Sequence, residues 1–302
     1  MIKRRLNAPL GASIIVLSSL FYASYGIWTT LMGNFFGGYT ASALRSILVL
    51  VIMVPVAIAR HQLGPINWRR HWPYVAGLLF SSCFTWGPFY YAVLHAGIGI
   101  ALTINYAGIV IGMFFFGWLF ARERFSKDKW LATLLGLIGL YLIFTPSIAD
   151  LGWLALVGAA VSGLSIASNS VIVKHLPYNA TQSTVFLWAT SVVANIFMAS
   201  VFREQHPAVG WYAQWLYLVF FAIASVAASW LFITGLKLVE AGVAGILGLL
   251  EIVFGVLFGI LFFSEHVGSV VDVGIITIIA AAAIPYIRDY NAQRGTLDKV
   301  GS

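Results

Sequence analysis

Long apolar runs separated by short polar or charged stretches make up almost the whole chain. A helix needs about 20 apolar residues to cross the hydrocarbon core of a bilayer, and runs near this length recur along the sequence. Glycine, proline and clusters of charge mark where each run stops. The pattern predicts an all-α membrane protein with ten transmembrane helices. The predicted spans cover residues 10–32, 39–59, 73–94, 98–121, 129–146, 151–173, 182–202, 211–235, 241–263 and 269–287.

Composition supports a membrane protein. The 302 residues are 61% hydrophobic and only 9% charged, whereas about a quarter of the residues in a soluble domain are charged. The chain therefore has too little polar surface to cover a water-facing globule. The lone cysteine, Cys83, excludes an internal disulfide and a cysteine-only metal site. We expect no metal site and no cofactor.

Basic residues predict the orientation of the spans. Of the 17 Lys and Arg residues, all except Arg45 and Arg203 fall on the N-terminal side of the membrane when the ten spans are threaded in order. Loops rich in Lys and Arg stay in the cytosol, so both termini are expected to be cytosolic. The net charge of +7 then reflects topology, and we expect the lipid bilayer rather than nucleic acid as the partner of this chain.

An internal repeat divides the chain. Residues 94–123 resemble residues 237–265, with Ala101 opposite Ala244 and Glu123 opposite Glu265. The two stretches are separated by about half the chain, so each repeat contains five spans. Because five is an odd number, the second repeat must be inverted in the membrane relative to the first. Inverted repeats are typical of secondary transporters, whose substrate site lies between the halves. The sequence predicts a first five-helix repeat over residues 1–148, a second over 149–287, a central cavity between them, and a polar tail over 288–302.

Several stretches resemble the ten-span EamA-type members of the drug/metabolite transporter superfamily. They are "YYAVLHAGIGIA" and "ITGLKLVEAGVAG" at the start of spans four and nine, "LLEIVFGVLFGILFFSE" within span nine, and "SALRSILVL" around Arg45. The "TINYAG" stretch of span four is most similar to the YddG-type exporters of aromatic and other amino acids in bacterial inner membranes. The family often carries a proline after the span-nine glutamate, where this chain has Ile252.

Aromatic and small polar residues recur at helical spacing within the spans, where positions four and seven apart share one face. Such a lining suits a small amphiphile, since rings stack on rings while hydroxyl and amide groups meet amino and carboxyl ends. For any one serine, helix packing is the competing explanation, whereas a mid-span amide such as Asn105 needs interior partners. The candidate substrate-binding residues are Tyr22, Tyr25, Trp86, Tyr90, Tyr91, Asn105, Tyr106, Ser165, Asn169, Ser229 and Trp230.

Glu251 and Arg45 are charged residues well inside their predicted spans. Glu251 is expected to face the bundle interior, because an unpaired carboxylate facing lipid costs several kcal/mol. Glu251 either couples transport to the movement of a proton or has a structural role. The resemblance favours the structural role, because a glutamate after "LL" in span nine is a feature that the family shares across substrates. Arg45 lies about six residues from the outer end of span two. It either extends to the outer headgroups or lines the outer vestibule, where it can meet a substrate carboxylate.

These features exclude some functions and favour one. The glycines of "HAGIGIA" follow no strand and precede no lysine, so they predict no phosphate cradle, and we expect no enzyme. The hypothesis is a monomeric secondary transporter of the bacterial inner membrane that exports small amphiphilic metabolites, mainly aromatic and other neutral amino acids, by alternating access. The alternatives are an exporter of multiple drugs or cationic compounds, and a membrane receptor or assembly factor that transports nothing.

Overall fold

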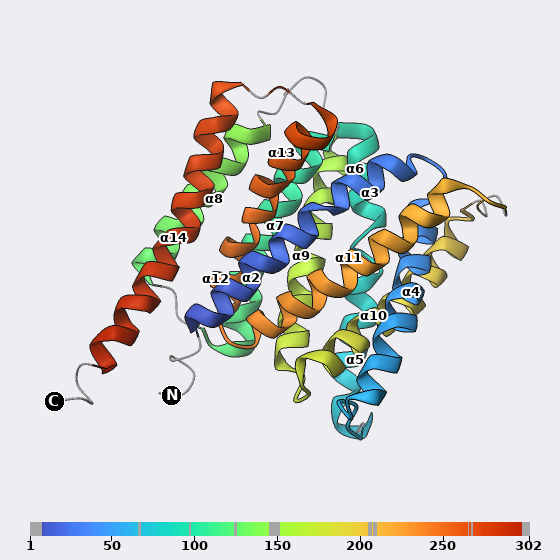
Figure 1. The fold of residues 1–302 in the computed structure, drawn as a ribbon, viewed down its shortest axis with the longest axis horizontal. Coiled ribbons are helices and arrows are strands. Elements are labelled where there is room, and N and C mark those ends of the chain that lie inside the picture. Colours follow the sequence, from blue (N-terminus) through green and yellow to red (C-terminus); the bar gives the residue numbers. More distant parts are fainter. Residues whose placement is uncertain are drawn as a thin grey trace.

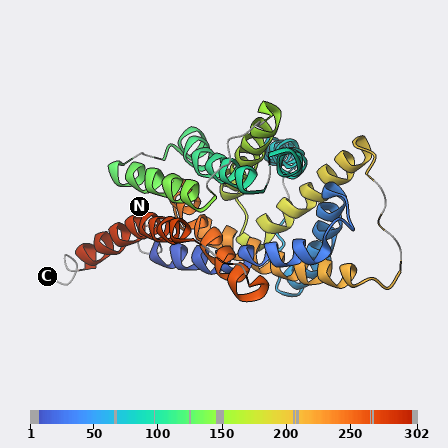
Figure 2. The same cartoon turned by 90° about the horizontal axis from the view of Figure 1, so that it is seen from above.

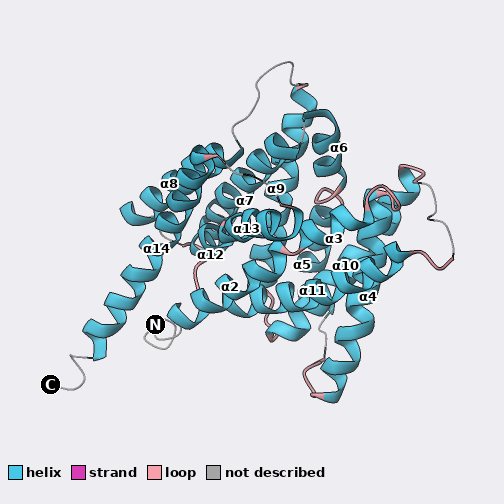
Figure 3. Ribbon diagram, turned by 45° about the horizontal axis from the view of Figure 1, so that its top comes forward, coloured by secondary structure: helices cyan, strands magenta, loops and turns pink. Residues whose placement is uncertain are grey.

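The described part of the chain is helical throughout (Figures 1 and 3). The computed structural model describes residues 8–65, 68–96, 98–123, 126–144, 152–204, 207, 210–264, 266 and 268–297. The helices are α2 (Ala8–Ala23), α3 (Tyr25–Met32), α4 (Gly38–Ala59), α5 (Trp68–Ser82), α6 (Gly87–Ala96), α7 (Ile98–Ala121), α8 (Lys127–Phe144), α9 (Trp153–His175), α10 (Ala180–Val201), α11 (Ala213–Leu236), α12 (Ala241–Gly248), α13 (Leu250–Phe263) and α14 (Ser269–Leu297).

Each predicted span corresponds to one of these helices or to a consecutive pair. Within the described residues, seven helical segments are long and apolar enough to cross a membrane, and α14 adds an apolar stretch over Ser269–Ile284. Span three is split into α5 and α6, and span five (α8) is 18 residues long and begins with charged residues. The predicted boundary between the halves, at residue 148, lies outside the described residues.

Three of the predicted spans are interrupted. The first breaks at Ser24, whose hydroxyl donates to the Phe21 carbonyl at 2.6 Å. The third breaks between Ser82 and Gly87, and the ninth breaks at Leu249. A helix break inside a membrane leaves backbone N–H and C=O groups without their helical hydrogen bonds, and these groups need partners from the protein. The three breaks are therefore expected to face the interior of the bundle.

The contacts between helices follow a two-fold pattern. The second span packs on the seventh (α4 on α10) and the fifth on the tenth (α8 on α14). The first packs on the eighth through α2 and α11, and its counterpart is the contact of the third with the sixth, through α5, α6 and α9. Figure 1 shows α8 beside α14 at one edge and α4 beside α10 at the other. An inverted repeat produces this exchange of partners.

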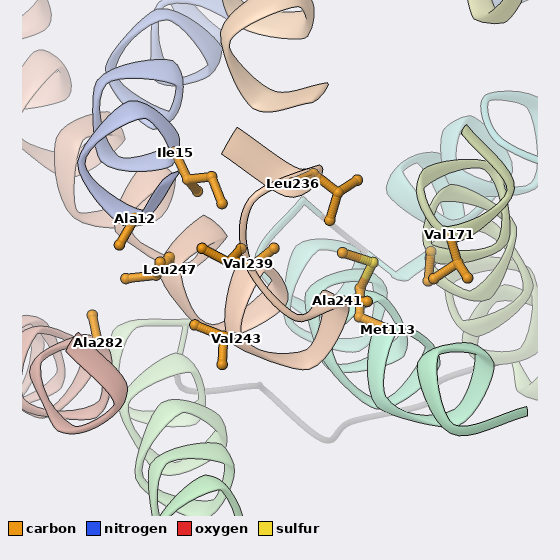
Figure 4. Close-up of a cluster of buried hydrophobic side chains, with 12 residues drawn as sticks. Ala12, Ile15, Met113, Val171, Leu236, Val239, Ala241, Val243, Leu247 and Ala282 are labelled. Atoms are coloured by element: carbon orange, nitrogen blue, oxygen red, sulfur yellow. The ribbon is translucent and has the colours of Figure 1, made fainter. Parts of the chain in front are cut away.

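The start of α2 and the end of α14 lie at the same end of the molecule, and the view from above keeps them together (Figures 1 and 2). Near this end an apolar cluster fills the space between the halves. It joins Ile15 of α2, Met113 of α7, Val171 of α9 and Leu247 of α12, and Figure 4 shows these side chains pointing toward one another. Large apolar side chains also cover the outer surface, as expected of a surface in contact with lipid.

Candidate functional site

Arg45 lies in an aromatic cage in the protein interior. Helix α4 carries it into the interior, where only 3% of its surface is exposed. Its guanidinium carbon lies 4.4 Å from the ring centroid of Phe221, 4.7 Å from Trp86, 5.3 Å from Tyr25 and 5.4 Å from Trp188. Arg45 therefore does not extend to the headgroups, which was one of the two expectations from the sequence. A desolvated cation over an aromatic face gains about 2 kcal/mol.

The cage leaves part of the guanidinium without a hydrogen bond. Nε and Nη1 of Arg45 are buried and have no hydrogen-bond partner. Two ion pairs among the described residues join Lys129 to Glu240 and Lys174 to Glu123, and neither includes Arg45. A buried polar group without a partner is rare in native structures and costs about 1–3 kcal/mol, more when charged.

Tyr22 packs on Tyr25, one of the four rings of the cage. The rings of Tyr22 and Tyr25 lie 5.2 Å apart in an edge-to-face arrangement, and Tyr25 lies 4.6 Å from Phe221 in the same geometry. The break at Ser24 separates the two tyrosines into different helices. Both Arg45 and Glu251 act electrostatically on the hydroxyls of Tyr22 and Tyr25.

Glu251 is in the first turn of α13, immediately after the break at Leu249. An acidic group is favoured there by the positive end of the helix dipole. Its carboxylate is within hydrogen-bonding reach of the Tyr106 hydroxyl on α7. The carboxyl group of Glu251 is therefore directed toward Tyr106 of α7, inside the bundle.

Two amides fasten the break in span three to α9. Asn105 is 4% exposed, and its Nδ2 donates to Ser162 Oγ at 2.8 Å and to the Ala159 carbonyl at 3.3 Å. The Ser162 hydroxyl in turn donates to the Thr85 carbonyl at 2.5 Å, inside the break. Asn169 accepts from the Ser81 hydroxyl, and its Nδ2 lies 3.3 Å from Ser82 Oγ. Both amides therefore hold the segment that carries Trp86.

Ser229 orients a wall of the cage. Its hydroxyl accepts from Trp188 Nε1 at 2.9 Å and donates to the Ser225 carbonyl at 2.6 Å. Trp230, on the neighbouring position of α11, donates from Nε1 to Thr181 Oγ1 at 3.0 Å and is 36% exposed. The two consecutive residues therefore serve different contacts, and only Ser229 reaches the cage.

The structure does not bring every candidate to the cage. Tyr90 is 40% exposed and lies against Gly38 at the start of α4. Tyr91 is 37% exposed and stacks on His95, with 4.0 Å between ring centroids. Ser165 is buried in α9. Of the eleven proposed binding residues, Tyr25 and Trp86 contact Arg45, and Tyr22 and Ser229 each contact one member of the cage.

Sequence reasoning missed Trp188 and Phe221 as cage residues. Tryptophans at the ends of spans form interfacial belts, but Trp188 lies well inside span seven and contacts Arg45. Its position within the span could have identified it as an interior residue. Phe221 is one of 22 phenylalanines and has no local feature that distinguishes it. Its role depends on the packing of α11 against α4.

Comparison with known proteins places the chain in a family. The sequence profile of the EamA-like transporter family matches twice, over residues 9–145 and 153–286. The chain belongs to the EamA-like transporter family. The two matches fall on the two halves of the bundle, and membership assigns membrane transport of small molecules to this multi-pass chain.

Two individual proteins are similar to this EamA-like chain. The first, named uncharacterized transporter YwfM, is from Bacillus subtilis (strain 168); it is 29% identical over 228 residues, covering 71% of this chain and 72% of the relative. The second is a protein known from a crystal structure, which has a TM-score of 0.76 at 17% identity and covers 91% of this chain and 97% of its own. At that identity the likeness concerns the fold.

Proposed function

We propose that this EamA-like transporter exports small amphiphilic metabolites, chiefly aromatic and other neutral amino acids, as in YddG-type exporters. One observation carries the proposal: the Arg45 guanidinium lies 5.3 Å from the ring of Tyr25, which packs on Tyr22, and the carboxyl group of Glu251 acts on the same two tyrosines. A zwitterion with an apolar or aromatic side chain complements this arrangement in charge and in surface. The chain acts as a monomer in the bacterial inner membrane, with both termini cytosolic.

Transport proceeds by alternating access, in which the site opens to one side of the membrane at a time. The apolar cluster around Ile15, Met113 and Leu247 closes the space between the halves near the start of α2. These side chains must separate before a substrate reaches the cage from that end. The breaks at Ser24 and Leu249 lie in spans that contribute to this cluster, and they allow the two parts of each span to move separately.

The test is flux of a radiolabelled amino-acid panel, aromatic and aliphatic, into proteoliposomes with and without an imposed pH gradient. Native protein and Glu251→Gln are compared. We expect saturable flux of phenylalanine and tryptophan that empty liposomes lack. Flux that follows the pH gradient and is lost in Glu251→Gln makes the carboxylate a coupling group; flux indifferent to both makes it structural. No flux of any amino acid would refute the substrate class.

A second candidate function is export of cationic compounds. The observation in its favour is that Glu251 lies near three tyrosine side chains, those of Tyr22, Tyr25 and Tyr106. Aromatic faces together with a carboxylate bind organic cations. Ethidium flux in the same liposomes distinguishes the two functions. A cation exporter transports ethidium, and phenylalanine does not inhibit this flux. An amino-acid exporter transports phenylalanine and does not transport ethidium.

A further inference from the structure

We propose that the unpaired guanidinium nitrogens of Arg45, Nε and Nη1, form a carboxylate-binding site that selects substrates with a free carboxylate. This inference rests on the proposed function and specifies the substrate class of the same site. It begins with the difference between Arg45 and the other buried cations. Lys129 and Lys174 are also buried, and each is paired with a glutamate, Glu240 and Glu123 respectively. In Arg45, two of the three guanidinium nitrogens have no partner.

The aromatic cage accounts for how an unpaired arginine persists in the interior. Guanidinium is more weakly hydrated than ammonium and stacks on aromatic faces. The four rings contact the planar group, yet an aromatic face is no hydrogen-bond acceptor comparable to a carboxylate, so Nε and Nη1 remain unsatisfied. Nε and Nη1 lie on different edges of the guanidinium, and each can donate a charge-assisted hydrogen bond to a carboxylate oxygen. The cage therefore holds the guanidinium of Arg45 in place, and a bound ligand provides the hydrogen-bond acceptors that the protein does not.

The surroundings of the cage define the rest of the ligand. Trp86 and Tyr25 place aromatic surface beside the guanidinium, so a carboxylate bound there has its apolar portion against rings. The carboxyl group of Glu251, like the guanidinium of Arg45, acts electrostatically on Tyr22 and Tyr25, and it lies within hydrogen-bonding reach of Tyr106. An ammonium group of the same ligand is favoured near this carboxyl group. The expected ligand is an α-amino acid or another carboxylate with an aromatic side group, rather than an amine that has no carboxylate.

The prediction concerns phenyl compounds that carry or lack a free carboxylate. Phenylalanine and 3-phenylpropionate carry the carboxylate, whereas phenylalaninamide and phenethylamine lack it. A site built to hydrogen-bond one group rejects analogues without it, because its own buried polar atoms then stay unpaired; we expect at least ~10-fold weaker binding of the two carboxylate-free compounds. Replacing Arg45 removes this preference.

The experiment measures binding and transport separately in purified full-length protein. Binding is followed by the ligand-induced shift of thermal unfolding in detergent, using the four compounds named above. The variants are Arg45→Lys, which keeps the charge without the fork, and Arg45→Met, which removes both. Arg203→Met is the matched control, since Arg203 is an exposed arginine after α10. We expect the carboxylates alone to stabilise native protein and Arg203→Met, and neither Arg45 variant to retain the preference.

Labelling of the native protein covers the case in which both Arg45 variants fail to fold. Phenylglyoxal modifies arginine, and mass spectrometry locates the modified residue. We expect 3-phenylpropionate, and not phenethylamine, to protect Arg45 while leaving modification of Arg203 unchanged. Absence of protection overturns the assignment, as does an Arg45→Met protein that still prefers carboxylates.

Transport of phenylalanine distinguishes failure of this inference from failure of the proposed function. Carboxylate binding that depends on Arg45 without any amino-acid flux refutes amino-acid export and leaves the site intact. Phenylalanine flux that phenylalaninamide and phenethylamine inhibit as strongly as phenylalanine itself refutes the carboxylate site and leaves export intact.

Discussion

The carboxylate of Glu123 lies at the first residue of α12, with Oε2 2.8 Å from the backbone nitrogen of Ala241. The two residues are 118 positions apart and belong to different halves of the chain. Glu123 Oε1 also accepts from Lys174 Nζ at 2.6 Å, and Lys174 donates to the Val239 carbonyl at 2.7 Å. The carboxylate therefore joins a helix N-terminus, where negative charge is favoured, to a buried lysine.

Glu123→Gln removes the negative charge that pairs with Lys174, whose side chain is only 3% exposed. Breaking a buried pair from one side costs about 3 kcal/mol or more, so we expect a clear fall in the temperature of thermal unfolding in detergent. Adding Lys174→Met recovers part of this loss. If the stability loss of the double variant equals the sum of the losses of the two single variants, the pairing is contradicted. Asp272→Asn, at an exposed carboxylate in the first turn of α14, is the control.

Gly163 lies at a close approach of α9 to α7. A Cβ added at Gly163 would collide with the backbone carbonyl of Asn105, and one added at Gly108 would lie 3.0 Å from the Ala160 carbonyl. Overpacking against backbone costs about 1–3 kcal/mol, so Gly163→Ala should unfold at a lower temperature than native protein.

Gly255 on α13 provides the matched control, because a Cβ there has no neighbour within 4 Å. In a helix interior alanine is favoured over glycine by up to about 1 kcal/mol. Gly255→Ala should therefore be neutral or more stable than native protein. Two alanine variants of equal stability would show that α7 and α9 do not approach as closely as described.

Asn105→Ala tests whether this amide contacts substrate or holds the fold. Its Nδ2 is engaged by Ser162 and the Ala159 carbonyl, so loss of the side chain leaves buried acceptors unpaired at a cost of about 1–3 kcal/mol. We expect a lower unfolding temperature, with the KM for phenylalanine in proteoliposomes changed less than threefold. A large rise in KM with unchanged stability would assign Asn105 to the substrate instead.

Lys237 predicts a pH dependence of stability. It follows α11, outside the spans, and its Nζ donates to the carbonyls of Val173 and Leu176 at 3.2 and 3.1 Å. Burial lowers the pKa of Lys237 from 10.5 to about 8. Between these two values the unfolded chain binds the proton more than the folded chain does, so the Lys237 contribution raises stability as pH rises from 8 to 10.5.

Thermal unfolding measured from pH 7 to 10.5 checks this prediction. Subtracting the curve of Lys237→Met from that of native protein removes the other titrating groups. The difference should increase with pH in favour of the native protein. A difference that is flat, or that falls with pH, contradicts the lowered pKa.

The sequence by itself determined which segments form helices, and that they make two equal halves. These properties are local, since about 20 apolar residues suffice to define a span and an odd number of spans per repeat inverts the second half. One of the three breaks also has a local signal, because Pro88 follows Gly87 at the start of α6, and proline favours the first turn of a helix. The break at Leu249 has no such signal.

Only the tertiary structure decided which residues surround Arg45. Its cage takes Tyr25, Trp86, Trp188 and Phe221 from four different spans, and helical spacing relates residues only within one span. Asn105 and Asn169 were predicted from their polarity, but their partners Ser162, Ser81 and Ser82 depend on how α7 and α5 pack on α9. Polarity in a span predicts an interior side chain because lipid offers no hydrogen bonds, whereas the identity of its partner is fixed by contacts between distant helices.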